Sequence, residues 1–288
     1  MNSFERSWEL TKASWRVLNH DRELLLFPIL SVVFSAAFVV AILFPTVILA
    51  LLNEASVAFA FPFYVSVFVM YFGLAFIATF FNTCVVYTTK TRFEGKNATF
   101  GESIRFSLSR MHLIFYWSLV AATVGIILRM LENAAQKSRG RFIIRMVVSM
   151  LGAAWSIVTL FVVPGMVYYG LGPFDAIKKS IGAIRKTWGE NLIAYLGFGF
   201  AQMVFLIVGI LAFIPLFFLF LAFGPLGVVL VILLGILYVV AVVLVFGILK
   251  SIFHTALFVY AEKGKVPSGY SKEMLKGAFQ RTPSKSPI

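Results

Sequence analysis

Ionisable residues are scarce in this chain, and cysteine is almost absent. Charged residues fill 13% of the 288 positions, whereas an ordinary globular protein carries roughly a quarter. The lone Cys84 lies in an apolar stretch, which excludes an intrachain disulfide and any metal site built from several cysteines.

The sequence also lacks the patterns that usually accompany catalysis. The three histidines, His20, His112 and His254, are not spaced as the three or four converging ligands that zinc needs. The chain has no nucleophile elbow, glycine-rich phosphate loop or paired-carboxylate motif. We therefore expect a protein that is not an enzyme and that binds no cofactor or metal ion.

Long apolar stretches dominate the chain instead. Hydrophobic residues make up 60% of it, and its mean hydropathy is +0.94. A helix of about 20 apolar residues crosses a bilayer core. We predict an all-α polytopic transmembrane bundle with six spans, at residues 24–52, 58–87, 113–128, 146–169, 192–223 and 226–249. The third is marginal in length, and Pro45, Pro164 and Pro215 predict kinks whose freed carbonyls need partners on neighbouring helices.

The Lys and Arg residues indicate the orientation. Twenty of the 25 lie in the N-terminal segment, the loops after the second and fourth spans, and the stretch after the sixth. The positive-inside rule therefore predicts a multi-pass protein of the cell membrane with both termini in the cytoplasm. The other five cluster between the third and fourth spans, at Arg129, Lys137, Arg139, Arg141 and Arg145.

This second cluster breaks the rule, because the six-span topology places it outside as an exterior basic patch. We expect spans 3 and 4 to continue as helices past the bilayer and to form an exposed hairpin with Gly140 in its turn. The alternative is that span 3 does not cross, which would change the topology.

Three short segments carry an apolar stripe at helical spacing, with charges on the other faces. They are residues 3–19, 100–111 and 173–188. Thr99 with Glu102 forms a capping-box pattern, and Pro173 suits a first helical position. We predict amphipathic helices on the cytoplasmic face of one membrane domain, residues 1–281, with a weaker example at 268–281 and a disordered tail at 282–288.

The predicted stripes are defined by their large side chains. The first runs through Phe4, Trp8, Thr11, Trp15 and Leu18, the second through Phe100, Ile104, Leu108 and Met111, and the third through Phe174, Ile177, Ile181, Ile184 and Trp188.

The net charge of +13 leads us to expect anionic membrane lipids as partners. No RNA- or DNA-binding motif accompanies the charge, so we expect no nucleic acid. The candidate headgroup contacts are Lys178, Lys179, Arg185 and Lys186. The alternative is that these cations only enforce topology. Small residues at four-residue spacing, such as Ala121 and Gly125, would allow close helix packing within the bundle or in a homo-oligomer or a complex with another membrane protein.

Few polar residues lie within the spans. We expect most of them to bond between helices, and Asn82 and Gln202 are the candidates for lining a pathway. The favoured function is a membrane-organising or lipid-interacting protein. The alternatives are a transporter or channel for a small neutral or amphiphilic solute and, third, a membrane enzyme.

Residues 152–190 carry a recognisable series of motifs. They are Ala154–Ser156, Phe161–Pro164, Gly172–Ala176, Lys179–Ser180 and Thr187–Glu190. With these motifs the chain resembles an uncharacterised family of six-span prokaryotic membrane proteins that is catalogued as a domain of unknown function. Residues 4–18 and the segment ending at Arg129 are also similar to it. The resemblance implies a fold and a membrane location, and it implies no catalytic or binding residues.

Overall fold

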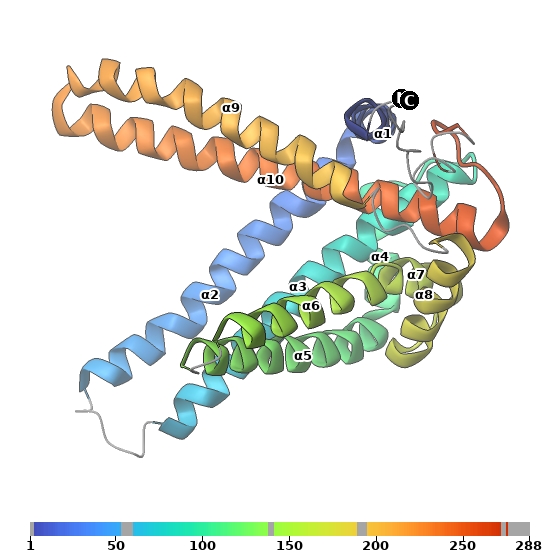
Figure 1. The fold of residues 1–288 in the computed structure, drawn as a ribbon, viewed down its shortest axis with the longest axis horizontal. Coiled ribbons are helices and arrows are strands. Elements are labelled where there is room, and N and C mark those ends of the chain that lie inside the picture. Colours follow the sequence, from blue (N-terminus) through green and yellow to red (C-terminus); the bar gives the residue numbers. More distant parts are fainter. Residues whose placement is uncertain (1–2, 53–59, 138–140, 189–194, 272–274, 276–288) are drawn as a thin grey trace, which may run out of the picture. The chain divides into compact units, whose positions relative to one another are not determined.

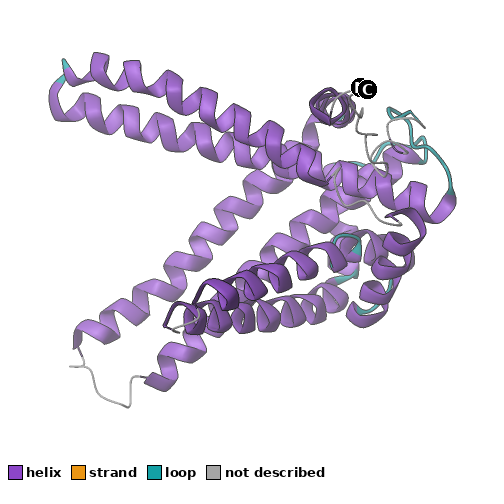
Figure 2. Cartoon of the chain, viewed as in Figure 1, coloured by secondary structure: helices purple, strands orange, loops and turns teal. Residues whose placement is uncertain are grey.

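Helices and the turns and loops between them make up the part that the computed structural model describes, which comprises residues 3–52, 60–137, 141–188, 195–271 and 275 (Figures 1 and 2). Six stretches within these residues are long and apolar enough to cross a membrane. In hydrocarbon the backbone must satisfy its own hydrogen bonds, and a continuous helix does so. The predicted all-α, multi-pass membrane class is therefore confirmed.

The helices follow one another with short connections. Their bounds are α1 Ser3–His20, the 3-10 helix η1 Arg22–Leu25, α2 Leu26–Leu52, α3 Ala60–Phe93, α4 Phe100–Ser109, α5 Met111–Lys137, α6 Arg141–Val158, α7 Val162–Tyr169, α8 Pro173–Trp188, α9 Tyr195–Leu221 and α10 Gly224–Lys263.

The chain forms two compact units. A terminal unit contains residues 1–25 and 185–288, and a central unit contains residues 26–184. In the terminal unit α1 packs on α9 and α10, whereas in the central unit α2, α4, α5 and α7 all contact α3 and α6 packs on α5. The expectation of one membrane domain stays a prediction, and each unit is described by itself.

The three amphipathic segments are helices, as predicted. They correspond to α1, α4 and α8. The capping box at the start of α4 is present, because the Glu102 N–H donates to Thr99 Oγ1 (3.3 Å) and the Thr99 N–H to Glu102 Oε2 (2.8 Å). Pro173 is the first residue of α8. The weaker fourth segment, 268–281, and the tail at 282–288 lie mostly or wholly outside the described residues.

Two helices extend beyond the predicted spans. The third span was expected at 113–128, but α5 has 27 residues and runs from Met111 to Lys137. At 1.5 Å per residue it measures about 40 Å, enough to cross the core and continue beyond it. The sixth was expected to end at 249, but α10 continues to Lys263. In both cases the helix extends past the apolar run because polar residues outside the core also support helical structure.

The fourth predicted span is interrupted. α6 ends at Val158 and α7 begins at Val162, two residues before Pro164. A proline lacks an N–H and clashes with the carbonyl four residues earlier, which breaks the helix there. The predicted interruption at Pro164 is therefore present. The expected partner was for a freed carbonyl, whereas the observed bond is made by an N–H: the Phe161 N–H donates to Ser180 Oγ of α8 over 3.2 Å. Pro45 and Pro215 lie inside α2 and α9, which continue through them.

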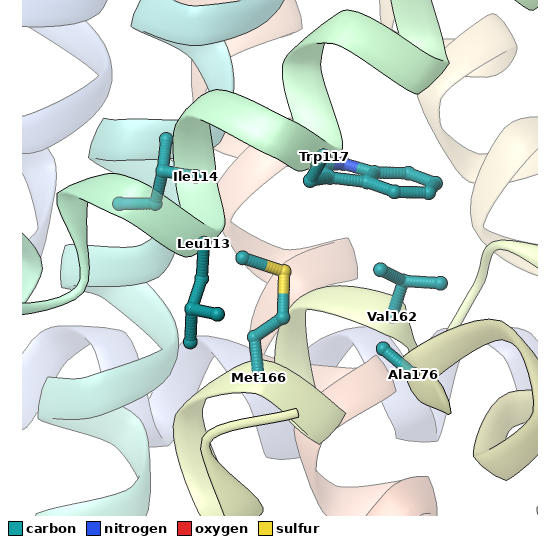
Figure 3. Packing of buried hydrophobic residues seen from close by; sticks show 6 residues of the cluster. All are labelled: Leu113, Ile114, Trp117, Val162, Met166 and Ala176. Carbon is teal, nitrogen blue, oxygen red and sulfur yellow. The ribbon is translucent and has the colours of Figure 1, made fainter. Parts of the chain in front are cut away.

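The core of the central unit joins α5, α7 and α8. Its buried members point toward one another in Figure 3 and are Leu113, Ile114, Trp117, Val162, Met166 and Ala176. Trp117 stacks on the partly buried Trp155 of α6 with ring centroids 6.1 Å apart. These contacts hold the short helix α7 against α5 and α8.

A row of hydroxyl and thiol groups joins α3 to α4. Thr88 Oγ1 and Ser103 Oγ are hydrogen-bonded at 2.7 Å, and Cys84 Sγ and Ser107 Oγ at 3.0 Å. Both helices use positions four residues apart, so the two bonds lie on successive turns of an antiparallel pair. All four residues are buried, and their small size lets the helices approach closely.

The terminal unit is organised around the α9–α10 hairpin. The turn ends at Gly224, which has a φ of 67° that favours glycine. Gly209 of α9 faces the Tyr238 ring of α10, whose hydroxyl donates to the Phe205 carbonyl over 2.6 Å. The buried Tyr270 hydroxyl is hydrogen-bonded to Ser14 of α1 at 2.7 Å, and burial raises the pKa of this phenol.

We expect Ser180→Ala to destabilise the central unit. The Phe161 N–H would remain buried without its acceptor, at a cost of about 1–3 kcal/mol. The unfolding midpoint should fall by several degrees, followed in detergent by the reaction of buried Cys84 with a thiol-reactive fluorophore. Ser156→Ala is the matched control, because the exposed Ser156 hydroxyl donates only within its own helix, to Gly152. Equal midpoints for the two variants would contradict the assigned role of Ser180.

Candidate lipid interface

The short helices pack on the protein through small side chains. α1 buries Ala13 and Ser14, and α4 buries Ser103 and Ser107. α8 buries three residues, Ala176, Ser180 and Ala183, each fully inaccessible. Small residues permit close contact between helices, and on α1 the larger Leu10, Val17 and Leu18 are buried beside them.

Several large apolar residues of these helices are left at the surface. Phe174 of α8 is 69% exposed, Leu108 of α4 is 49% exposed and Trp15 of α1 is 47% exposed. Trp8 and Met111 are exposed as well. These residues belong to the predicted stripes, and their exposure leaves them accessible to the membrane interface in which the helices are expected to lie. Thr11 and Leu18 of the first stripe are buried instead, and the side chain of Phe4 lies outside the described residues.

The predicted headgroup residues lie on α8. Lys178 is exposed and forms a 3.9 Å ion pair with Asp175, a surface contact of little energetic weight. Lys179 Nζ lies 4.8 Å from the centroid of the Tyr169 ring, and Arg185 is exposed. The side chain of Lys186 lies outside the described residues.

Two further cations gather at the end of α7. Lys90 Nζ of α3 lies 5.0 Å from the centroid of the Tyr168 ring. Arg110, between α4 and α5, places a guanidinium nitrogen 2.6 Å from the position that a Cβ on Gly170 would occupy. Together with Lys179 they surround the C-terminal end of α7, whose carbonyls favour positive charge. Sequence reasoning counted these cations for topology but could not bring them together, because they come from three separate segments.

The second basic cluster lies at the opposite end of α5 and α6. Arg129 forms a 3.1 Å ion pair with Glu132, and Arg145 is exposed. Lys137 is the last residue of α5 and Arg141 the first of α6, whereas Arg139 lies outside the described residues. Arg129 follows Met111 by 18 positions, about 27 Å along the helix. The lengths of α5 and α6 fit the expected hairpin, in which both helices continue beyond the bilayer core at the end that carries this cluster.

The two candidate pathway residues belong to different units. Asn82 belongs to α3 of the central unit and is half-buried, whereas Gln202 belongs to α9 of the terminal unit. Gln202 Oε1 accepts a 2.8 Å hydrogen bond from Lys250 Nζ of α10. This pair was missed because Lys250 was taken as the first residue after the last span, whereas α10 continues through it.

An apolar groove lies within the terminal unit between α1 and the α9–α10 hairpin. Its volume is about 500 Å³. It is lined by Trp8, Thr11, Lys12, Trp15, Phe205, Tyr238, Ala241, Val242, Val245, Phe246 and Leu249. A second groove of about 560 Å³ lies farther along α9 and α10, and Tyr238 lines both.

The described residues contain no group of three or more His, Cys, Asp or Glu that could hold a metal ion. Hydroxyls within the spans mostly bond along their own helices: Thr83, Ser118 and Thr159 each donate to the carbonyl four residues earlier. Aromatic and aliphatic faces beside Lys and Arg are suited to amphiphiles with anionic headgroups.

The chain belongs to a family of unknown function, DUF6159, whose model matches residues 61–269. The match includes the 152–190 segment and confirms the resemblance to an uncharacterised family. α1 lies outside the matched range. Searches of curated proteins and of solved structures found no match to this chain.

We expect Gly209→Leu to destabilise the α9–α10 hairpin. A Cβ at this position would overlap the Tyr238 ring, which must move and lose its bond to Phe205. Overpacking of this kind costs about 1–3 kcal/mol. Intrinsic tryptophan fluorescence on heating should report a lower midpoint. Gly199→Leu on the same helix has no neighbouring atom within 4 Å and should leave the midpoint unchanged; a loss of the same size in both variants would refute the contact.

Proposed function

We propose that the protein is a non-enzymatic component of the cell membrane that binds anionic lipids and organises them around its cytoplasmic face. α1, α4 and α8 would lie in that interface, with both chain termini in the cytoplasm. Membrane lipids are then its principal partners, and nucleic acid is not among them.

The observation that carries this proposal is the orientation of the short helices. Each leaves at least one large apolar side chain exposed while burying small ones; α8, for example, buries Ser180 and exposes Phe174. A soluble surface would gain nothing from an exposed Phe174, Leu108 or Trp15. At the headgroup level these side chains would be buried among acyl chains, at roughly 25 cal/mol per Å² of apolar surface removed from water.

The charges support the choice of anionic lipids. Lys90, Arg110 and Lys179 meet at the end of α7, and Lys178 and Arg185 are exposed on α8. Each Lys or Arg near an anionic surface contributes about 1 kcal/mol of attraction. These cations adjoin the exposed apolar residues of α8, so one surface would contact both the headgroup and the chains.

Transport or channel activity for an amphiphilic solute is the second candidate. The observation in its favour is the break between α6 and α7, because transporters bind solutes where helices are discontinuous. At this break, however, the Phe161 N–H already donates to Ser180. We therefore rank lipid binding first, and a membrane enzyme third.

We expect purified protein in mixed nanodiscs to enrich phosphatidylglycerol over phosphatidylcholine. Lys178→Gln combined with Lys179→Gln should reduce that enrichment up to about thirtyfold, because two attractive charges of about 1 kcal/mol each are lost. The readout is the lipid composition of protein-bound lipid by native mass spectrometry. Lys263→Gln combined with Lys265→Gln removes the same charge at the end of α10 and serves as the control. No preference for the anionic lipid in the wild type would overturn the proposal.

The orientation can be tested with Gln136→Cys in a Cys84→Ser background. Gln136 is exposed near the end of α5, so an impermeant maleimide should label it in intact cells. Lys96→Cys in the same background is exposed at the opposite end of the central unit and should react only after lysis. The reverse labelling pattern would place the termini outside and the short helices on the exterior face.

A further inference from the structure

We propose that the groove between α1 and the α9–α10 hairpin holds an acyl chain of one anionic phospholipid, with its headgroup at Lys12. The inference rests on the proposed lipid-binding function and assigns it a discrete site. The groove is formed entirely within the terminal unit, whereas Lys90, Arg110, Lys178 and Lys179 belong to the central unit.

The groove is built by a helix that crosses the hairpin. In Figure 1 α1 is seen end-on, whereas α9 and α10 run across the view, so their long axes cross. α1 is anchored on its other side by Leu10, Ala13, Ser14 and Val17, which are all buried. Trp8 and Trp15, two turns apart on α1, form its contribution to the groove wall.

The interior of the groove is apolar. Phe205 of α9 and Val242, Val245 and Phe246 of α10 line it, and the Trp8 ring stacks near Phe205 with centroids 6.4 Å apart. The Tyr238 hydroxyl already donates to the Phe205 carbonyl, so this side chain offers its ring to the groove. A volume of about 500 Å³ is within the usual range of small-molecule sites, and its lining suits a hydrocarbon chain.

The polar group that could select a headgroup is Lys12. Its side chain is exposed, and its ammonium lies 5.5 Å from the centroid of the Trp8 ring, which forms the groove wall. A cation at the edge of an apolar groove matches an amphiphile that carries a negative charge. The floor of the groove belongs to the spans Ala201–Leu221 and Gly224–Lys263, where phospholipid is the surrounding solvent. These two observations favour a phospholipid over a soluble anion.

The test uses the full-length protein, delipidated mildly in detergent and examined by native mass spectrometry. We expect the wild type to retain one phosphatidylglycerol when offered equal amounts of phosphatidylglycerol, phosphatidylcholine and a free fatty acid. Ala241→Phe should abolish retention, because the ring occupies the groove. Ala212→Phe is the matched control: it places the same ring at an exposed position of α9 outside both grooves and should retain the lipid.

Lys12→Gln tests the headgroup contact without altering the shape of the groove. It should lower the preference for phosphatidylglycerol over phosphatidylcholine about fivefold while leaving one lipid bound. Arg16→Gln removes a charge one turn away that does not line the groove, and it should have a smaller effect. Quenching of Trp8 and Trp15 fluorescence by phosphatidylglycerol brominated on its acyl chains gives an independent readout, which Ala241→Phe should reduce.

The outcomes separate this site from the general function. Enrichment of anionic lipid in nanodiscs with an unchanged bound lipid in Ala241→Phe would overturn the groove site and leave the proposed function standing. Equal retention of phosphatidylcholine, capture of the free fatty acid instead, or a lipid-free dimer that buries the groove would each overturn the assigned occupant. Loss of the lipid in Ala241→Phe without any nanodisc enrichment would support the site and remove the broader function.

Discussion

The requirement that every backbone polar group be satisfied without water governs this structure. Long apolar helices meet it internally, so the six membrane-spanning stretches need little else. The break between α6 and α7, just before Pro164, is a point where one helix cannot meet the requirement alone, and there Ser180 of α8 accepts a hydrogen bond from the Phe161 N–H. That bond ties a short amphipathic helix to the interruption and places α7 in the core with Trp117 and Met166.

Close approach through small residues is the second principle of the fold. The row of Cys84, Thr88, Ser103 and Ser107 joins α3 to α4, while Ala176, Ser180 and Ala183 seat α8. Because hydrocarbon solvates a leucine as well as a protein core does, large apolar residues have no reason to turn inward in a membrane protein. Their exposure on α1, α4 and α8 therefore follows from the same physics that packs the helices, and it creates a surface suited to lipid.

Much of the fold could be predicted from residue patterns. Hydropathy located the six crossings, helical spacing located α1, α4 and α8, and Thr99 with Glu102 located the start of α4. The extent of α5 and α10 was underestimated, because hydropathy reports where the chain is apolar and not where its helix ends. Which residues of each short helix pack on the protein could not be predicted, since apolar periodicity does not distinguish a side that meets protein from one that meets lipid.

The sequence by itself determined the membrane class, the helical content and the position of the amphipathic segments, because these depend on local composition and period. Only the tertiary structure decided which residues meet. Lys90, Arg110 and Lys179 come from separate segments and gather around α7, and Lys12 reaches a groove whose walls are some 190 to 240 residues away in the chain. Residues from separate segments meet because of how the helices cross and pack, and this packing cannot be predicted from the spacing of residues along one helix.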